Sequence, residues 1–147
     1  MIIILIAIDF ITKYMAMLYL SAPIFIMDII TLHFVKNHGI GFSLLSNKSN
    51  LYQICFGILA IIISLIILYK IEIKDNITNI SIKLIAAGGL SNGIDRILTL
   101  GVTDFIGLNY YKKYFIFCNM ADIYLTIGAF LIILEPLINK YLNNLKK

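Results

Sequence analysis

The sequence predicts an all-α membrane protein, a bundle of four transmembrane helices with a small extracytoplasmic β-like segment between the first and second helices. Hydrophobic residues make up 61% of the 147 residues and charged residues only 14%, whereas charged residues reach about 25% in soluble domains. Four runs have the roughly 20 apolar residues needed to cross about 30 Å of hydrocarbon. Because no soluble stretch remains between them, we expect a single integral-membrane domain over residues 1–147.

The four predicted spans follow one another with short connections. They cover residues 1–20, 51–69, 77–100 and 119–138. The first span lacks a basic start, and two charged residues interrupt it, so we expect it to be retained rather than cleaved as a signal peptide. Residues 21–50 form the external segment, in which residues 29–35 are a candidate short strand. Residues 101–118 are expected to be a plain connection.

The distribution of basic residues predicts the orientation. Six of the twelve basic residues flank the link between the second and third spans or follow the fourth span, against four in the opposite loops. This excess favours both termini in the cytoplasm. A net charge of +4 suits a neighbourhood of anionic lipid. Since no groove of mixed aromatic and basic residues is evident, we expect no nucleic-acid partner.

Cysteines and histidines give no sign of a metal or redox site. Cys55 and Cys118 lack the spacing of a metal-binding or redox pair. His33 and His38 are five residues apart in a loop without a nearby cysteine or acidic companion. The sequence therefore predicts no bound metal and no cofactor.

The first span carries an acid and a base four residues apart, Asp9 and Lys13. Side chains at this spacing share one helix face, and the acid precedes the base, which is the more favourable order. An ion pair that orients the first helix is the favoured interpretation, because paired charges are already satisfied. Lys13 can still point toward a site.

The third span ends in a polar, glycine-rich stretch, residues 87–96. Its small residues four apart, such as Gly89 and Gly93, predict close contact with another backbone. Gly88, Asn92 and Arg96 also recur every four residues. Glycine is explained by packing, but an amide and a guanidinium are costly in lipid, so these two groups are candidates for holding a substrate backbone.

Two further acids stand at the ends of the last two spans. Asn119 and Asp122 are three residues apart at the start of the fourth span, where they can cap the helix and complement its dipole. Asp104 follows the end of the third span. In an antiparallel hairpin of helices these carboxyl groups lie at similar depth, so Asp104 and Asp122 can meet. Asp95 is the rival acid, although its place beside Arg96 suits a structural ion pair.

Five blocks of the sequence resemble, in order, motifs of the lipoprotein signal peptidases, also called signal peptidase II. The resemblance covers nearly the whole chain. The blocks are D-F-I-T-K at residues 9–13, N-H-G-I-G-F-S at 37–43, N-G-I-D-R at 92–96, V-T-D-F at 102–105 and N-M-A-D at 119–122.

The resemblance implies the activity and the roles of the site residues. It implies an aspartic endopeptidase in which Asp104 and Asp122 are catalytic and the residues that support them or contact the substrate are Asp9, Lys13, Asn37, Asn92, Arg96 and Asn119. The implied substrate is a diacylglyceryl prolipoprotein, cut just before its lipid-bearing cysteine, at the extracytoplasmic face. We expect the enzyme to act as a monomer in contact with membrane lipid.

Two carboxyl groups held close together predict the mechanism. Like charges at short range do not both ionise cheaply, so one acid keeps its proton and the pair titrates as a unit. The ionised acid takes a proton from water while the protonated acid donates to the scissile carbonyl. Two alternatives remain on the sequence alone: a carrier or channel subunit with an ion or proton relay through Asp9, Lys13, Asp95 and Arg96, and an assembly factor without a reaction.

Overall fold

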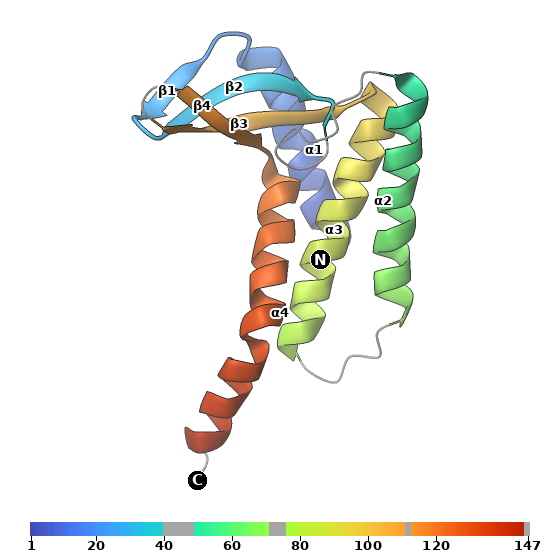
Figure 1. The fold of residues 1–147 in the computed structure, drawn as a ribbon, viewed down its shortest axis with the longest axis vertical. Helices are drawn as coiled ribbons and strands as arrows, with labels where there is room; N and C mark the ends of the chain where they lie inside the picture. Colours follow the sequence, from blue (N-terminus) through green and yellow to red (C-terminus); the bar gives the residue numbers. More distant parts are fainter. Residues whose placement is uncertain (40–48, 71–75, 111–112, 146–147) are drawn as a thin grey trace.

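The computed structural model describes the chain except residues 40–48, 71–75, 111–112 and 146–147. Helices stand side by side beneath a small sheet that lies across one end of them (Figure 1). In chain order the elements are α1 (Ile2–Tyr19), β1 (Ile24–Met27), β2 (Ile30–Asn37), α2 (Asn50–Lys70), α3 (Asn76–Thr99), β3 (Val102–Tyr110), β4 (Lys113–Cys118) and α4 (Met120–Leu145). Four helices therefore occupy the places of the four predicted spans, and α4 continues past the expected end at residue 138 to Leu145.

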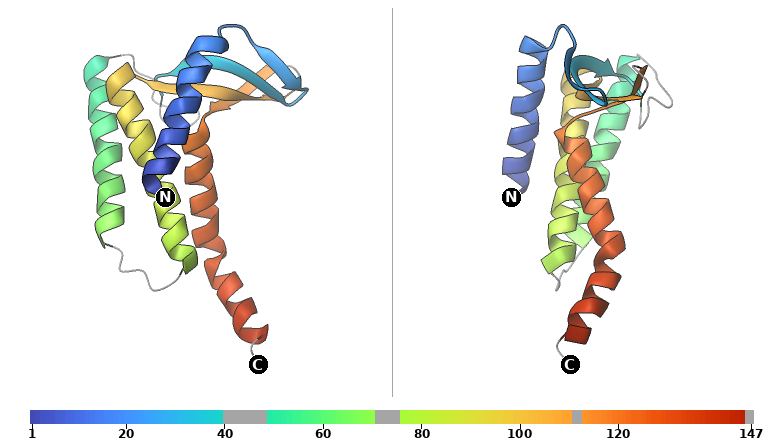
Figure 2. Two further views of the ribbon diagram at one scale, coloured as in Figure 1. Left: turned by 180° about the vertical axis from the view of Figure 1, so that it is seen from behind. Right: turned by 90° about the vertical axis from the view of Figure 1, so that its left-hand side faces the viewer.

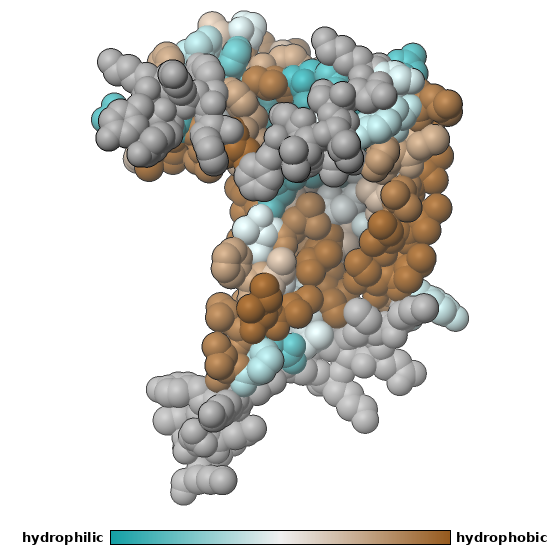
Figure 3. All heavy atoms as spheres, viewed as in Figure 1, coloured by the Kyte–Doolittle hydropathy of each residue, from teal (hydrophilic) through white to brown (hydrophobic). Residues whose placement is uncertain are grey.

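Three of the helices in the described residues are long and apolar enough to cross a membrane: α1, α2 and α4. Their outward-facing surfaces carry many exposed large hydrophobic side chains, and hydrophobic atoms cover the visible helix surface below the sheet (Figure 3). The helix α3 is more polar and packs against the other three helices. This arrangement keeps the polar groups of α3 away from lipid.

The expected β-like segment between the first two helices is only part of the sheet that the structure contains. The structure contains a four-stranded antiparallel sheet in the order β1-β2-β3-β4, and Figure 2 shows it extending sideways from the helix ends. The expected strand at residues 29–35 is confirmed as β2, but residues 101–118 form the strands β3 and β4 rather than a plain connection. Pairing these segments satisfies their backbone N–H and C=O groups.

The β2–β3 register joins the two halves of the chain. Asn37 pairs with Val102 and Val35 pairs with Asp104, while a register shift falls between Leu32 and Val35. The end of β2 is thereby held beside the start of β3. This pairing brings the segment before α2 next to the segment after α3.

The predicted close-packing face of α3 is confirmed by its glycines. A Cβ added to Gly93 would lie 2.9 Å from the carbonyl oxygen of Gly57 on α2, and one added to Gly88 would lie 2.5 Å from that of Ala121 on α4. Real Cβ atoms are scarcely ever this close to a backbone atom. Glycine therefore sets how closely α3 approaches both neighbours.

Candidate active site

The structure brings Asp104 and Asp122 to one cavity. Asp104 lies on β3 and is only 1% exposed, whereas Asp122 lies in the first turn of α4. Both line a cavity of about 780 Å³. The cavity is bounded by residues of α2, α3, α4, β2, β3 and β4, so it lies where the helices meet the sheet.

Asn119 connects the two acids. Its backbone N–H donates to Asp122 Oδ2 at 3.1 Å, and its side-chain oxygen accepts from the Asp122 N–H at 3.0 Å. This reciprocal pair is a capping box that begins α4. The side-chain amide of Asn119 also donates to Asp104 Oδ1 at 2.7 Å. One fully buried residue thus caps the helix and fixes both carboxylates.

Two further asparagines donate to the acids, and each has its orientation set by a second hydrogen bond. Asn37 Nδ2 donates to Asp104 Oδ2 at 2.8 Å, while its oxygen accepts from the Gly39 N–H at 2.9 Å. Asn92 Nδ2 donates to Asp122 Oδ1 at 2.8 Å, while its oxygen accepts from Lys13 Nζ at 2.8 Å. Every oxygen of the two carboxylates therefore accepts an N–H.

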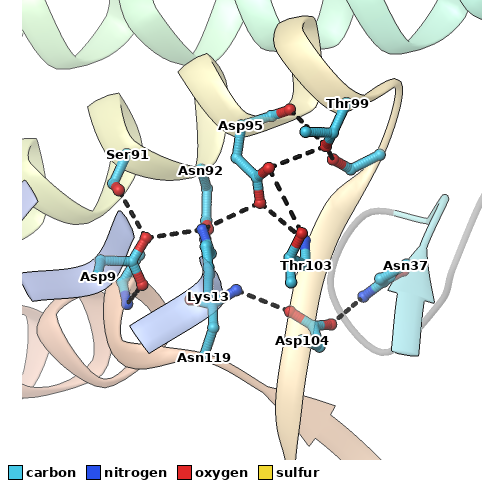
Figure 4. A network of polar contacts seen from close by, with 12 residues as sticks. Asp9, Lys13, Asn37, Ser91, Asn92, Asp95, Thr99, Thr103, Asp104 and Asn119 are labelled. Atoms are coloured by element: carbon cyan, nitrogen blue, oxygen red, sulfur yellow. Dashed lines mark hydrogen bonds and ion pairs between the residues drawn. The ribbon is translucent and has the colours of Figure 1, made fainter. Parts of the chain in front are cut away.

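The ion pair predicted from the spacing in α1 is present and buried. Lys13 Nζ lies 2.7 Å from Asp9 Oδ2, with the two side chains 3% and 0% exposed. Asp9 also accepts from Ser91 Oγ at 2.6 Å and from the Ala121 N–H at 2.9 Å. It thus satisfies a first-turn donor of α4, and α1 is tied to α3 and α4 (Figure 4).

Asp95 does form ion pairs, but its partners are lysines rather than Arg96. Asp95 lies 3.3 Å from Lys13 Nζ and 3.9 Å from Lys36 Nζ. Its carboxylate also accepts the Thr103 N–H at 2.8 Å. Because Thr103 precedes Asp104, this contact fixes the backbone next to Asp104. Asp95 is not among the residues that line the cavity, so its role is structural.

Arg96 is engaged by protein groups. Its Nη1 donates to Gln53 Oε1 at 2.6 Å and its Nη2 donates to the Gly39 carbonyl at 2.7 Å. Gln53 was not among the predicted site residues. The sequence pattern that could have indicated it is an amide near the start of an uncharged apolar run. Gly88 lies against Ala121 on α4 and is not among the residues lining the cavity, so it serves the helix packing.

Burial changes the acid–base chemistry of two groups outside the helices. It raises the pKa of Asp104 to about 7, helped by the nearby charge of Asp122 and opposed by the hydrogen bonds from Asn37 and Asn119. Burial also raises the pKa of Cys118 to about 11, so this residue lines the cavity as a neutral thiol. Among the residues with described structure, no three His, Cys, Asp or Glu side chains gather as metal ligands would.

Comparison with known proteins identifies the family. The family model described as signal peptidase (SPase) II matches residues 1–138. The lipoprotein signal peptidase of Pelagibacter ubique (strain HTCC1062) is 36% identical over 126 residues, which cover 86% of this chain and 74% of the relative. The lipoprotein signal peptidase of Haemophilus ducreyi (strain 35000HP / ATCC 700724) is 32% identical over 142 residues, covering 93% and 88% of the two chains.

Solved structures agree with this assignment. A bacterial membrane enzyme determined by the in meso method at 2.3 Å resolution superposes with a TM-score of 0.76 at 27% identity, covering 95% of this chain and 86% of the other. A second, determined at 1.9 Å, gives a TM-score of 0.75 at 31% identity, with coverage of 92% and 89%. The arrangement of helices and sheet is therefore that of a multi-pass bacterial membrane enzyme, and the chain belongs to the lipoprotein signal peptidase (signal peptidase II) family of aspartic peptidases.

Proposed function

We propose that Asp104 and Asp122 are the catalytic pair of this lipoprotein signal peptidase. The main support is that both carboxylates line one cavity and are bound by the same residue, Asn119. They come from different elements, β3 and α4, so their convergence is a product of the fold. Family membership leaves no support for the alternatives of a carrier, a channel subunit or an assembly factor.

The pair shares one proton in the reaction that we propose. A water molecule attacks the scissile carbonyl carbon and gives a proton to ionised Asp122, while protonated Asp104 donates its proton to the carbonyl oxygen. The tetrahedral intermediate then collapses, the C–N bond breaks, and the leaving nitrogen takes the proton held by Asp122. The hydroxyl proton returns to Asp104. One water is consumed, and neither a metal nor a covalent intermediate is needed.

The supporting side chains hold this pair in place rather than reacting. Asn37 and Asn92 keep their amide groups on the acids because their oxygens are engaged elsewhere. Fixed donors of this kind need no reorganisation during the reaction. We expect the external segment that carries Asn37 to close over the substrate. The part of this segment at residues 40–48 lies outside the described residues.

The substrate that we propose is a diacylglyceryl prolipoprotein, cut just before its lipid-bearing cysteine. The named relatives are lipoprotein signal peptidases. The cavity supports this choice because it is polar at the acids and apolar below them, along α2 and α4. Its apolar lining includes Phe56, Leu59, Ile63, Ile123 and Ile127. An apolar signal segment and acyl chains match such a wall.

We also propose the placement in the membrane. All four helices span the bilayer of the bacterial inner membrane, with α3 shielded by its neighbours, both termini cytoplasmic and the sheet at the extracytoplasmic face. The support is that the chain ends lie away from the sheet (Figure 1). A monomer suffices for activity, since one chain supplies both acids and all the donors described above.

Separate substitutions of the two acids test the proposal. Asp104→Asn and Asp122→Asn should each reduce conversion of a diacylglyceryl prolipoprotein to the mature form by at least about a thousandfold. Asp28→Asn, at the exposed turn between β1 and β2, is the matched control and should process normally. Normal processing by both active-site variants would exclude this pair as the catalytic groups.

The raised pKa of Asp104 predicts how the rate depends on pH. Asp104 gives up its proton as the pH rises through about 7, and the pair then carries two negative charges and lacks its acid. The value of kcat/KM should therefore fall on the alkaline side with an apparent pKa near 7, a property of the coupled pair. A rate that stays constant from pH 6 to pH 9 would contradict the assignment of Asp104 as the acid.

A further inference from the structure

Gln53 is a polar residue in an unusual place. It lies near the start of α2 and is completely buried. The run around it is apolar enough to cross a membrane. A glutamine amide costs free energy in such surroundings unless its polar atoms are hydrogen-bonded. An apolar side chain of similar volume would suit helix packing as well, so packing alone does not account for this residue.

Both ends of the Gln53 amide are used on the same short segment of chain. Its Nε2 donates to the His38 carbonyl at 2.9 Å. Its Oε1 accepts from Arg96 Nη1 at 2.6 Å, and the same guanidinium donates through Nη2 to the Gly39 carbonyl at 2.7 Å. Gln53 and Arg96 therefore form a two-residue clamp on two successive carbonyl groups.

The clamped segment carries one of the donors to the proposed catalytic pair. Asn37 precedes His38, and its amide donates to Asp104 at 2.8 Å. The orientation of that amide depends on the Gly39 N–H, which donates to Asn37 Oδ1 at 2.9 Å. The peptide groups that the clamp holds are thus the ones that aim the Asn37 amide. Gln53 itself does not line the cavity.

We propose that Gln53 is a positioning residue of this peptidase, which acts through the residue 37–39 segment to hold the Asn37 amide on Asp104. The inference rests on the proposed role of Asp104. It adds a role in catalysis for α2, which supplies no side chain directly to the two acids among the contacts described above.

A residue that acts in this way changes the acid–base behaviour of the site as well as its rate. The hydrogen bond from Asn37 lowers the pKa of Asp104 against the effect of burial. Loosening that donor raises the pKa of Asp104, so the alkaline limb of the pH–rate profile moves to higher pH. A residue that only stabilises the helix bundle would leave this limb in place.

The test is a double-mutant cycle between Gln53 and Asn37 on the full-length enzyme, with a diacylglyceryl prolipoprotein as the substrate. Gln53→Met should lower kcat about tenfold and move the alkaline limb up by about half a pH unit. In the Asn37→Ala background the same change should cost less than about twofold and leave the limb unmoved. Ser64→Ala is the matched control, since Ser64 is a buried polar residue of α2 that donates within its own helix to the Ala60 carbonyl at 2.8 Å.

A second variant keeps the test decisive if Gln53→Met does not fold in detergent. Gln53→Glu retains an acceptor for Arg96 but loses the donor to His38, so the same drop in kcat and the same small effect in the Asn37→Ala background are expected. The proposal would be overturned if the Gln53 substitution lowered kcat by the full tenfold in the Asn37→Ala background as well. An unmoved pH profile in a folded Gln53→Met variant would also overturn it. If Asp104→Asn retains activity, the proposed catalytic pair is wrong instead, so the two failures are distinguishable.

Discussion

Replacing Asp104 with asparagine should remove activity yet make the fold more resistant to alkaline conditions than the wild type. Asp104 is 1% exposed, and its pKa is raised from 3.8 to about 7. The unfolded chain releases this proton near pH 4 and the folded chain near pH 7. Between these values the folded protein holds more protons, so its free energy of unfolding falls as the pH rises.

The magnitude follows from the size of the shift. Each pKa unit is worth about 1.4 kcal/mol, so the full shift of about three units lowers stability by about 4 kcal/mol above pH 7. About 3 kcal/mol of this is lost between pH 5 and pH 8. The asparagine variant is spared this loss. The substitution separately lowers the free energy of unfolding by about 1–3 kcal/mol. The reason is that the NH₂ group of the new side chain faces one of the two amide donors that bind the carboxylate in the wild type. That cost does not depend on pH.

The assay is thermal or denaturant unfolding in detergent micelles at pH 5 and pH 8, followed by circular dichroism because the chain has no tryptophan. The free energy of unfolding of Asp104→Asn minus that of the wild type should be larger at pH 8 than at pH 5 by about 3 kcal/mol. Asp28→Asn, at the exposed turn, should give a smaller difference. An equal stability difference at the two pH values for Asp104→Asn would refute the claim that the buried acid holds its proton.

Three other substitutions test the framework around the acids. Asn119→Ala removes the helix cap and a donor to Asp104, so it should lower stability by about 1–2 kcal/mol in unfolding experiments and lower kcat more than it raises KM. Lys13→Met leaves Asp9 buried without its cation and should lower the free energy of unfolding by about 3–5 kcal/mol. Adding Asp9→Asn to Lys13→Met should restore part of this stability, and no recovery would show that the charge is not the cause. Gly88→Ala forces α3 away from α4 and should cost about 1–3 kcal/mol, and an unchanged melting temperature would contradict the close contact.

The helices were predictable because membrane thickness fixes the length of an apolar run. The ends of α1, α2 and α3 fall within one residue of the predicted spans. One strand of the sheet was predicted, at residues 29–35, but the complete sheet was not, because β2 and β3 pair with α2 and α3 between them. An aspartate, a glycine and an asparagine also interrupt the apolar pattern of β3, at Asp104, Gly107 and Asn109. Pairing at such distance in the sequence leaves no local signal.

The site was partly predictable for a related reason. Charged and amide groups are costly in an apolar chain, so Asp9, Lys13, Asn92 and Asp122 stood out. The residues that these side chains contact could not be predicted, since a helical spacing identifies a shared face but not the residues that pack against that face. Arg96 was expected to hold substrate, and only the fold shows it donating to Gln53 and Gly39. Gln53 itself was hidden because one amide hardly changes the mean hydropathy of a long apolar run.

The hydrogen bond from the Ala121 N–H to Asp9 has a consequence for biosynthesis. The first turn of the last helix is completed by a residue made 112 positions earlier, so this contact forms only after the start of α4 has been translated. A nascent chain that still lacks its final span holds neither Asn119 nor Asp122, so it lacks the cap of α4 and one acid of the proposed catalytic pair. The proposed site is therefore complete only when the last span has joined the other helices.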